Sequence, residues 1–369
     1  MNRERYQRQI ILNGFGIEGQ ERLFTAKVLV IGAGGLGCPA LQYLVAAGVG
    51  LIGLADDDLV EISNLQRQIL YGSEDVGSLK VEVAAKHLRQ LNPDVKCVLH
   101  PVSINAENAL RIIKDYDVVF DGTDNFVSRY LINDACTLLK KPLVFAAVSD
   151  FEGQLAVFNV EDENGTKTNY RDLFPVPPKP GEIPNCIENG ILGVVPGIIG
   201  TMAAGEIIKI IAKIGKPLTN KLLHYNLLNQ QQYEITITPS NEYKQVLGEA
   251  DFMNRHKKNI TETYLEIDIE QMIEMQNNPA TLIVDVRERH EFPKLDSNVY
   301  KQVPMAEFEN FAASSIAQQN IILICQHGIR SVAAAEILHQ KLGEAKNIYS
   351  LKGGISKWRQ FFLTIQHER

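Results

Sequence analysis

A glycine-rich turn, Gly32-Ala33-Gly34-Gly35-Leu36-Gly37, constrains the fold of this chain more than any other feature. It follows an apolar stretch, residues 28–31, that is typical of a buried strand, and it precedes residues 38–47, where apolar side chains recur with helical spacing. In such a strand, turn and helix the glycines allow a tight turn, and the N–H groups at the start of the helix can bind a phosphate. The turn therefore predicts a nucleotide site, with Gly34 and Gly35 close to the phosphates.

Several polar residues follow a second apolar stretch, residues 51–55. Asp56 ends this predicted strand, where a carboxylate can accept hydrogen bonds from ribose hydroxyls, and Asp58 follows closely. Asn64, Arg67 and Lys80 then supply an amide and two cations. Arginine binds phosphate oxygens in a bidentate manner and lysine adds a compact charge, so this set suits a triphosphate better than a nicotinamide.

A third predicted strand, residues 117–121, brings Asp124 and Asn125 to the same edge of the sheet. Mg²⁺ usually takes one or two carboxylates together with substrate phosphates, so we expect Asp124, with an adjacent amide, to hold Mg²⁺ beside a bound triphosphate. An NAD-dependent oxidoreductase is the weaker alternative, because no histidine falls between His100 and His224 to transfer a proton.

From Arg5 to about Thr238 the chain resembles the MoeB/ThiF adenylyltransferases, which are relatives of the ubiquitin-activating enzymes. The resemblance rests on motifs that follow one another in the family's order: Arg5-Tyr6-Gln7-Arg8-Gln9, Gly32-Ala33-Gly34-Gly35-Leu36-Gly37-Cys38, Asp56 with Asp58, Ser63-Asn64-Leu65-Gln66-Arg67-Gln68, Val76-Gly77 with Lys80-Val81, and Asp121-Gly122-Thr123-Asp124-Asn125.

The resemblance implies an ATP-dependent reaction on a small ubiquitin-like sulfur-carrier protein. Its C-terminal glycine, the last of a Gly-Gly tail, would be adenylated, with release of pyrophosphate. By the same resemblance Asn64, Arg67 and Lys80 would bind the phosphates and Asp124 the Mg²⁺. Arg8 would reach the triphosphate of a partner subunit, which implies a homodimer. The carrier stays open among the molybdopterin, thiamine-thiazole and tRNA-thiolation types.

The domain organisation follows from how strands and helices alternate. Residues 1–238 alternate between the two, which predicts an α/β fold: a Rossmann-like, mostly parallel sheet with helices on both faces. Residues 239–260 are polar and charged, and we expect them to form a linker with at most one short helix. A smaller α/β domain is expected over residues 261–369, since a chain of 369 residues is long for one domain.

Cys325 is the candidate nucleophile of the second domain. It ends an apolar stretch, residues 321–325, and a helix is expected from residue 332, so N–H groups of the intervening loop can stabilise an anionic sulfur. This loop and residues 351–358 resemble a single rhodanese domain, with Cys325 as the persulfide carrier and a cysteine desulfurase as a typical sulfur donor. The expected persulfide loop comprises Cys325, Gln326, His327, Gly328, Ile329, Arg330 and Ser331.

The chain departs from these families at three places. The segment between Phe292 and Pro304 lacks the Gly-His-Ile element of rhodaneses. Many MoeB/ThiF relatives bind a structural zinc through two Cys-x-x-Cys pairs, but residues 169–172 and 239–245 contain no cysteine, so no zinc is expected. Cys186 follows a proline-rich stretch, and the resemblance leaves open whether it is a catalytic thiol that bonds to the carrier or its persulfide.

Composition narrows the partners and the compartment. A net charge of −7 without a basic face argues against nucleic acid as a partner. The N-terminus has no apolar signal core, and the most apolar run, residues 191–205, is short for a membrane span, so we expect no membrane association. The five cysteines are scattered, which fits a reducing, cytoplasmic location.

Two functions of different classes stay open. The favoured one is an enzyme that adenylates the carrier and supplies sulfur from Cys325 to form a thiocarboxylate. The alternative is a module that binds nucleotide and carrier, whose rhodanese domain only docks partners. Intact Arg67, Lys80, Asp124 and Cys325 favour the enzyme.

Overall fold

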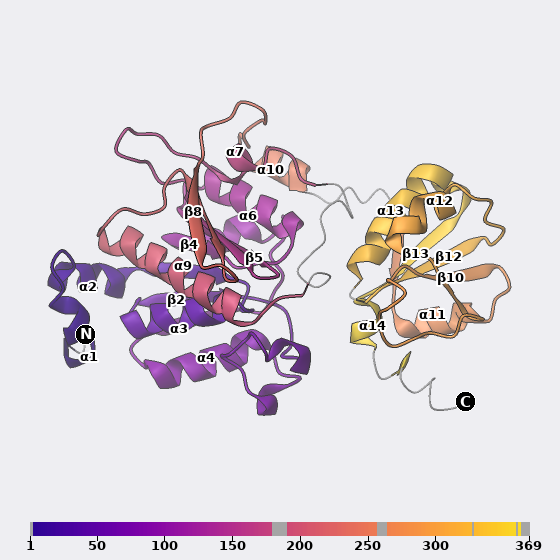
Figure 1. The fold of residues 1–369 in the computed structure, drawn as a ribbon, viewed down its shortest axis with the longest axis horizontal. Helices are drawn as coiled ribbons and strands as arrows, with labels where there is room; N and C mark the ends of the chain where they lie inside the picture. Colours follow the sequence, from indigo (N-terminus) through magenta and orange to yellow (C-terminus); the bar gives the residue numbers. More distant parts are fainter. Residues whose placement is uncertain (1–2, 179–189, 257–263, 327, 359–360, 363–369) are drawn as a thin grey trace. The chain divides into compact units, whose positions relative to one another are not determined.

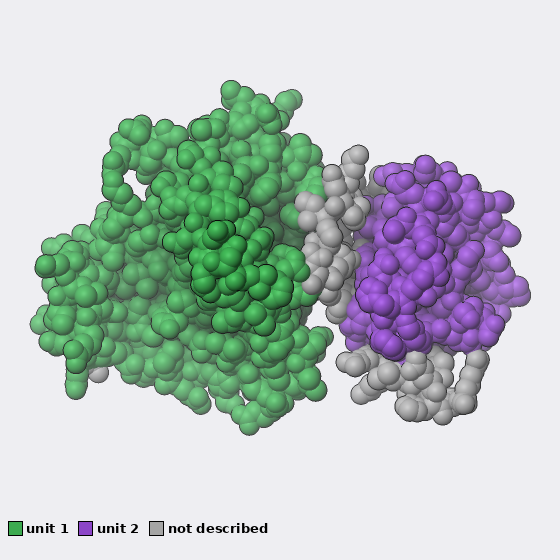
Figure 2. All heavy atoms as spheres, viewed as in Figure 1, with its two compact units in different colours: residues 1–178, 184–257 green, residues 179–183, 258–369 purple. Residues whose placement is uncertain are grey.

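The fold comes from a computed structural model that describes residues 3–178, 190–256, 264–326, 328–358 and 361–362. The chain divides into two compact units, shown in green and purple in Figure 2. The first contains the described residues up to His256 and the second those from Tyr264 onward. Each unit is built around its own sheet, as the sequence predicts.

The first unit contains an eight-stranded sheet. Five neighbouring strands are parallel, and the last three continue the sheet in antiparallel fashion. This is the Rossmann-like, mostly parallel arrangement that the sequence predicts. In sheet order the strands are β3 (Lys96–His100), β2 (Leu51–Ala55), β1 (Lys27–Ile31), β4 (Val118–Asp121), β5 (Leu143–Ser149), β6 (Glu152–Phe158), β7 (Lys221–Asn226) and β8 (Gln231–Thr236).

Helices cover both faces of this sheet because its central strands are apolar on both sides (Figure 1). Val28 and Val30 of β1 pack into one core, and Leu29 and Ile31 into the other. Residues of α2 (Gly16–Thr25), α3 (Gly37–Ala47), α4 (Lys80–Leu91) and α9 (Val194–Ala212) belong to the first core. The second core includes residues of α5 (Ala109–Ile113), α6 (Phe126–Leu138), α7 (Tyr170–Leu173) and α10 (Glu249–His256). A further helix, α1 (Arg3–Ile10), precedes α2, and two short 3₁₀ turns lie at Ile62–Asn64 and Ser73–Asp75.

The strand order reverses between β1 and β4. The chain leaves β1 toward β2 on one side and leaves β4 toward β5 on the other. In open α/β sheets the loops after two such strands diverge and leave a crevice at their carboxyl ends, where ligands bind. The loops that begin at Gly32 and Gly122 flank this position.

Helix α9 is the most apolar helix of the first unit. By length and composition alone, its 19 residues could cross a membrane. The apolar run noted in the sequence covers only residues 191–205, which are too few for a span. However, Val195, Ile199, Ala203 and Ile207 are buried in the same core as β1. We therefore interpret α9 as a core helix of the first unit.

The second unit is a smaller sheet of five parallel strands between two helical layers. In sheet order these are β11 (Tyr300–Gln302), β10 (Thr281–Asp285), β12 (Asn320–Ile324), β13 (Asn347–Leu351) and β9 (Leu265–Ile267). One core holds α12 (Met305–Ala312) and α13 (Ile329–Leu342), and the other holds α11 (Ile269–Gln276) and α14 (Gly354–Lys357). The 3₁₀ turn Gly343–Ala345 follows α13. The segment that departs from the rhodanese pattern leads into β11, at the edge of this sheet.

Most of the segment expected as a linker, residues 239–260, packs on the first unit. Val246 and Phe252 are buried in the core that also contains α6. Helix α10 forms the end of this packed segment. The first unit therefore extends to His256, beyond the boundary at residue 238 that the charged composition suggested.

Candidate functional site

The glycine turn after β1 is shaped by backbone contacts that exclude side chains. Gly32 has a φ of +91°, and a Cβ atom there would lie 2.8 Å from the carbonyl oxygen of Gly122. A Cβ atom on Gly37 would lie 2.0 Å from the carbonyl oxygen of Gly32. Glycine is therefore required at both positions, one to bring the turn against the loop after β4 and one to begin α3 close to the strand.

Two buried side chains that sequence reasoning did not assign to the site support this turn. The hydroxyl of Tyr71 donates a 2.8 Å hydrogen bond to the carbonyl of Ala33. The Gln68 amide nitrogen would lie 3.5 Å from a Cβ atom on Gly34 and donates to Asn64 Oδ1 at 2.7 Å. Gln68 Oε1 is buried and accepts no hydrogen bond from any described residue, which is unusual in a folded protein. The sequence indicated Gln68 only as the last residue of the motif at 63–68.

Asp56 is directed at the turn by its position at the end of β2. Its Oδ2 accepts a 2.7 Å hydrogen bond from the Ala33 N–H, and its Oδ1 accepts a 2.9 Å bond from the Asp58 N–H. Burial raises the pKa of Asp56 above its usual value, while the nearby Lys80 opposes this shift. The carboxylate thus lies beside the glycine turn, where the sequence predicts the ribose.

Lys80 begins α4, and its side chain is only 4% exposed. Its Nζ lies 2.8 Å from Oδ2 of Asp58, whose side chain is 68% exposed. Burial alone would lower the pKa of Lys80, but attraction to Asp56 and Asp58 outweighs burial and raises it, with a further contribution from Asp124. The structure therefore gathers three predicted site residues around the buried ammonium group of a fourth, Lys80.

Asn64 and Arg67 approach the glycine turn from the loop after β2. Arg67 Cγ would lie 3.4 Å from a Cβ atom on Gly35, so the arginine stem packs against the turn. Its Nη1 donates to the carbonyl of Ser63 at 3.2 Å. The Asn64 amide donates to Glu61 Oε2 at 3.2 Å. Arg67 thus lies beside the turn, and Asn64 is connected to it through Gln68.

Asp124 and Asn125 lie in the loop after β4, on the other side of the crevice. The Gly122 N–H donates to the carbonyl of Ile31 at 2.9 Å, which ties this loop to the end of β1. Asp124 is exposed, as a ligand of Mg²⁺ between protein and phosphates must be. Asn125 instead caps α6, since its Oδ1 accepts a 2.9 Å hydrogen bond from the Ser128 N–H.

Arg8 lies apart from this site in its own chain. It is exposed on α1, and the neighbouring Gln9 donates to the carbonyl of Ala47 at the end of α3. The glycine turn lies at the opposite end of α3, roughly 16 Å away for a helix of 11 residues. Arg8 therefore does not join the other predicted site residues of its own chain, and its contact with a partner's triphosphate stays a prediction.

Cys325 follows β12 and is buried, and its sulfur lies inside the loop that precedes α13. The Gly328 N–H donates to Sγ at 3.1 Å, and the Ser331 hydroxyl lies 3.4 Å from Sγ. Ser350 of β13, which the sequence did not single out, bonds to the Ser331 hydroxyl at 2.9 Å. The Gly328 N–H thus points at the sulfur and favours an anion there, while the Ser331 hydroxyl donates to the carbonyl of Gly328.

Arg330 is paired with a residue that the sequence did not single out. Its two Nη atoms lie 2.6 and 2.8 Å from the carboxylate oxygens of Glu291. Because this pair neutralises the guanidinium, Arg330 adds less charge at the sulfur than we expected. Gln326 bonds to Ser356 and to the buried Arg287, which fixes the other side of the loop. His327 and the side chain of Ile329 lie outside the described parts of the chain.

Comparisons with known proteins agree with this geometry. Residues 6–246 match the ThiF family, and residues 268–361 match the rhodanese-like domain. The chain belongs to the ThiF family. A sulfur carrier protein adenylyltransferase of Thermus thermophilus is 52% identical to this ThiF protein over 63% of the chain and 87% of the relative.

Two further relatives share both domains. A probable adenylyltransferase/sulfurtransferase, MoeZ of Mycobacterium tuberculosis, is 38% identical over 96% of this chain and 92% of its own. The adenylyltransferase and sulfurtransferase MOCS3 of Arabidopsis thaliana is 33% identical over 96% and 82%. These relatives confirm the expected class of enzyme for the ThiF protein, an adenylyltransferase joined to a sulfurtransferase, and its family implies the use of ATP.

Solved structures confirm the fold of the first unit. The crystal structure of E. coli MccB has a TM-score of 0.57 at 23% identity and covers 65% of this chain and 71% of that one. The structure of E. coli MccB with ATP has a TM-score of 0.53 at 22% identity, covering 66% and 74%. At this identity the likeness concerns the fold alone.

The other described cysteines of this ThiF protein are packing residues. Burial raises the pKa of Cys38 to about 12, and it raises the pKa values of Cys97 and Cys136 as well. Each of the three is therefore a neutral thiol near pH 7. Cys186, the second candidate nucleophile, lies outside the described residues.

Proposed function

We propose that this protein uses ATP to adenylate the C-terminal glycine of a ubiquitin-like sulfur carrier, and that sulfur from Cys325 then converts this glycine to a thiocarboxylate. The observation that carries the proposal is the pairing of two sites in one chain. Arg67 packs against the glycine turn where the strand order of the first sheet reverses, and Lys80 interacts with Asp124 and with Asp56, which bonds to that turn. Cys325 is held by N–H and hydroxyl groups in the second unit.

The adenylation step joins two anions. The carrier's glycine carboxylate attacks the α-phosphorus of ATP, the bond to the β-phosphate oxygen breaks, and pyrophosphate leaves. Arg67 and Lys80 oppose the repulsion between carboxylate and phosphates and stabilise the charge that develops on pyrophosphate. Lys80 is suited to this because its ammonium is buried, where a charge acts more strongly than in water.

Mg²⁺ and a second subunit complete the proposed site. The exposed carboxylate of Asp124 fits Mg²⁺, which would neutralise part of the phosphate charge. Asp124 would hold the metal, and Asp56, which bonds to the Ala33 N–H, would hold the ribose. We propose a homodimer in which Arg8 reaches the triphosphate of the partner subunit.

The sulfur step requires two thiols. The terminal sulfur of a Cys325 persulfide attacks the glycine acyl carbon, AMP leaves, and an acyl disulfide forms. A second thiolate then attacks the Cys325 sulfur, which releases the thiocarboxylate and leaves a protein disulfide for an external thiol to reduce. Cys186 is our candidate for this second thiol.

The proposal extends to the partners. The sulfur donor would be a cysteine desulfurase, which generates persulfide sulfur in the cytoplasm. The carrier would be of the molybdopterin or thiamine-thiazole type, each with a Gly-Gly tail. The relatives are named for adenylation and sulfur transfer, which supports this part of the proposal and leaves the pathway open.

Replacing Cys325 with alanine tests the division of labour. We expect Cys325→Ala to keep ATP–pyrophosphate exchange that depends on a carrier with a free Gly-Gly terminus, because adenylation uses charges of the first unit alone. Thiocarboxylate formation should stop, as measured by the mass of the carrier after incubation with ATP and a sulfur donor. Cys97→Ala, a substitution at a packing cysteine, is the control and should retain both activities.

Thiocarboxylate formed by Cys325→Ala at the wild-type rate would show that the second unit only docks partners. Absence of exchange in the wild-type protein with every Gly-Gly carrier tested would contradict the adenylation proposal itself. Pyrophosphate exchange should be the same with and without NAD. A requirement for NAD would favour the alternative of an oxidoreductase.

A further inference from the structure

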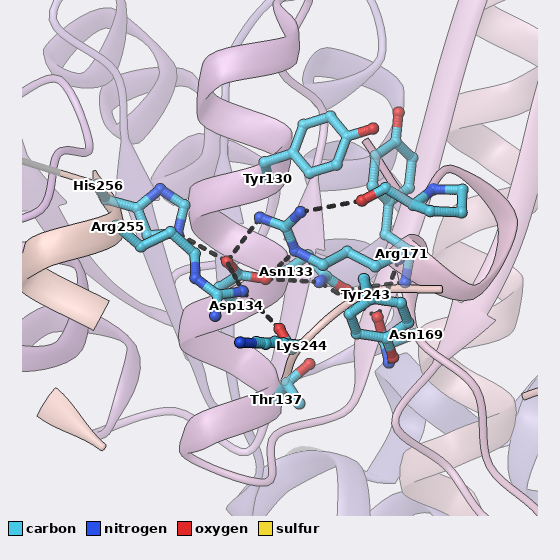
Figure 3. Close-up of polar contacts among 12 residues, drawn as sticks. Tyr130, Asn133, Asp134, Thr137, Asn169, Arg171, Tyr243, Lys244, Arg255 and His256 are labelled. Carbon is cyan, nitrogen blue, oxygen red and sulfur yellow. Dashed lines mark hydrogen bonds and ion pairs between the residues drawn. The ribbon is translucent and has the colours of Figure 1, made fainter. Parts of the chain in front are cut away.

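The positions that carry zinc ligands in the family pattern come together in this chain without a thiol. Asn169 and Asp172 stand in place of the first Cys-x-x-Cys pair, and residues 239–245, where the second pair is expected, contain Ser240 and Tyr243 but no cysteine. Asp172 Oδ1 accepts from the Ser240 N–H at 2.7 Å and lies 3.3 Å from the Tyr243 hydroxyl. The Asn169 amide bonds to Asp172 and to Tyr243, which lies beside it in Figure 3.

This donor set does not fit a structural zinc ion. Such sites use cysteine and histidine in tetrahedral geometry, and none of these four positions holds either residue. Asp172 is the only carboxylate among the four, and each of its oxygens already faces two donors. Burial raises the pKa of Tyr243, and Asp172 adds to this shift, so the hydroxyl stays a neutral donor. Hydrogen bonds therefore occupy the place of metal bonds.

A buried charge cluster continues the same connection. Arg171, which precedes Asp172 on α7, binds Asp134 of α6 through Nε at 2.7 Å and Nη2 at 2.8 Å. His256 Nε2, at the end of α10, lies 2.8 Å from Asp134 Oδ2. Figure 3 shows Arg171 and His256 approaching Asp134 from different elements, with Arg255 beside them. One carboxylate thus connects α6, α7 and α10.

Apolar packing and backbone contacts complete the attachment of α10. Phe252 is fully buried, and its ring lies 4.9 Å from that of His256. Arg255 Nη1 donates to the carbonyl of Lys244 at 2.7 Å, which joins α10 to the segment that leads into it. The segment from Ser240 to His256 is therefore attached to the first unit by polar contacts at both ends and by the buried Phe252 between them.

We propose that Asp134, Asn169, Arg171, Asp172, Ser240, Tyr243 and His256 form a metal-free clasp that fastens residues 239–256 to the first unit. Hydrogen bonds and one buried charge cluster hold this segment where zinc-bound thiolates hold it in the family pattern. The clasp thus accounts for the packing of residues beyond 238 on the first unit as far as His256, the last described residue before the second unit.

Metal analysis of the full-length protein gives the first test. Protein produced with zinc in the growth medium should contain far less than one zinc ion per chain, and a chelator at neutral pH should leave its melting temperature unchanged. One zinc ion per chain, or a fall in melting temperature with the chelator, would overturn the proposal.

Hydrogen exchange of the full-length protein gives the second test. Tyr243→Phe removes one donor to Asp172, and we expect the amides of residues 239–256 to exchange about tenfold faster, as for the loss of one hydrogen bond. Asp172→Asn should accelerate them at least as much, because its amide donors would face N–H groups. The controls are Tyr233→Phe on β8 and Asp115→Asn, which change exposed side chains of the same types.

The location of the effect decides between a clasp and general destabilisation. Faster exchange confined to residues 239–256 supports the clasp. Unchanged exchange there in both variants, or equal acceleration across α3 and β1, contradicts it. Should Asp172→Asn fail to fold, the milder Tyr243→Phe variant carries the test.

Discussion

Two clusters of the first unit contain the same types of charged residue but differ in how completely they are paired. In the nucleotide site, the buried Lys80 meets Asp58, whose side chain is 68% exposed, and Asp124 is open to solvent. In the clasp, Asp134 is 3% exposed and is bound by Arg171 and His256. Paired, buried charges hold a structure together, whereas half-paired charges at the carboxyl ends of parallel strands are available to a ligand. Surroundings, and not residue type, separate the two roles.

The largest effect is expected when the clasp loses its central carboxylate. Asp134→Asn should lower the free energy of unfolding of the first unit by about 3–5 kcal/mol, because it leaves Arg171 buried without a counter-charge. Denaturant unfolding followed by circular dichroism measures this change. Asp115→Asn, at an exposed aspartate, should stay within about 0.5 kcal/mol. A loss as small as the control's would remove the distinction between the clusters.

The same carboxylate predicts how the difference depends on pH. Burial alone would raise the pKa of Asp134, but hydrogen bonds from His256 and Arg171 outweigh burial and hold the pKa below its ordinary value. The stability that Asp134 contributes is therefore complete above pH of about 3.9 and is lost as the pH falls through the lower, folded-state pKa. Melting temperatures of the wild type and Asp134→Asn, measured from pH 7 downward, should converge only in this acidic range. If the two melting temperatures already converged near pH 6, the pH dependence of stability would come from a group other than Asp134.

The nucleotide site should show the reverse pattern. Arg67→Ala and Asp124→Ala should each slow carrier-dependent pyrophosphate exchange roughly 10²–10³-fold, about 2.7–4 kcal/mol, as for loss of one preorganised charge stabiliser. Their unfolding free energies should change by less than about 0.5 kcal/mol. Arg89→Ala, at an exposed cation in the last turn of α4, is the control for both measurements. Near wild-type exchange in either variant contradicts the phosphate or metal role.

The smallest effect separates a cap from a ligand at Asn125. Its Oδ1 caps α6, so Asn125→Ala should cost about 1 kcal/mol of stability, and Asn125→Ser should restore most of it. If capping is the whole role, the serine variant also keeps wild-type exchange. Slow pyrophosphate exchange in both variants, despite restored stability in Asn125→Ser, would show that Asn125 also contributes to nucleotide binding.

The first cluster could be predicted from sequence because each part is local. The strand at 28–31, the turn from Gly32 to Gly37 and the strand ending at Asp56 are contiguous, and parallel strands bring their carboxyl ends to one edge. The role of Gln68 was not predicted, because it depends on burial beside Gly34, which no local sequence pattern indicates. The ion pair of Glu291 was not predicted, because its partner, Arg330, lies 39 residues away in the sequence.

The clasp could not be predicted because its pairs are distant in sequence. Asp134 is 37 residues from Arg171 and 122 from His256. Residues 239–256 are charged enough to suggest a solvated linker, and Phe252 gives a single apolar position in α10 that is fully buried. The missing cysteines showed what the segment lacks, and only the structure shows what replaces them.

The composition of the clasp has a chemical consequence for an enzyme that handles reactive sulfur. Persulfide sulfur and oxidants react with thiolates, including those of exposed structural sites. The clasp holds its segment with oxygen and nitrogen atoms alone. Cys38, Cys97 and Cys136 stay protonated through burial and compete poorly for sulfur. In the proposed reaction, sulfur carried by Cys325 would therefore meet few rival nucleophiles among the described cysteines, and the clasp offers no thiolate for an oxidant to attack.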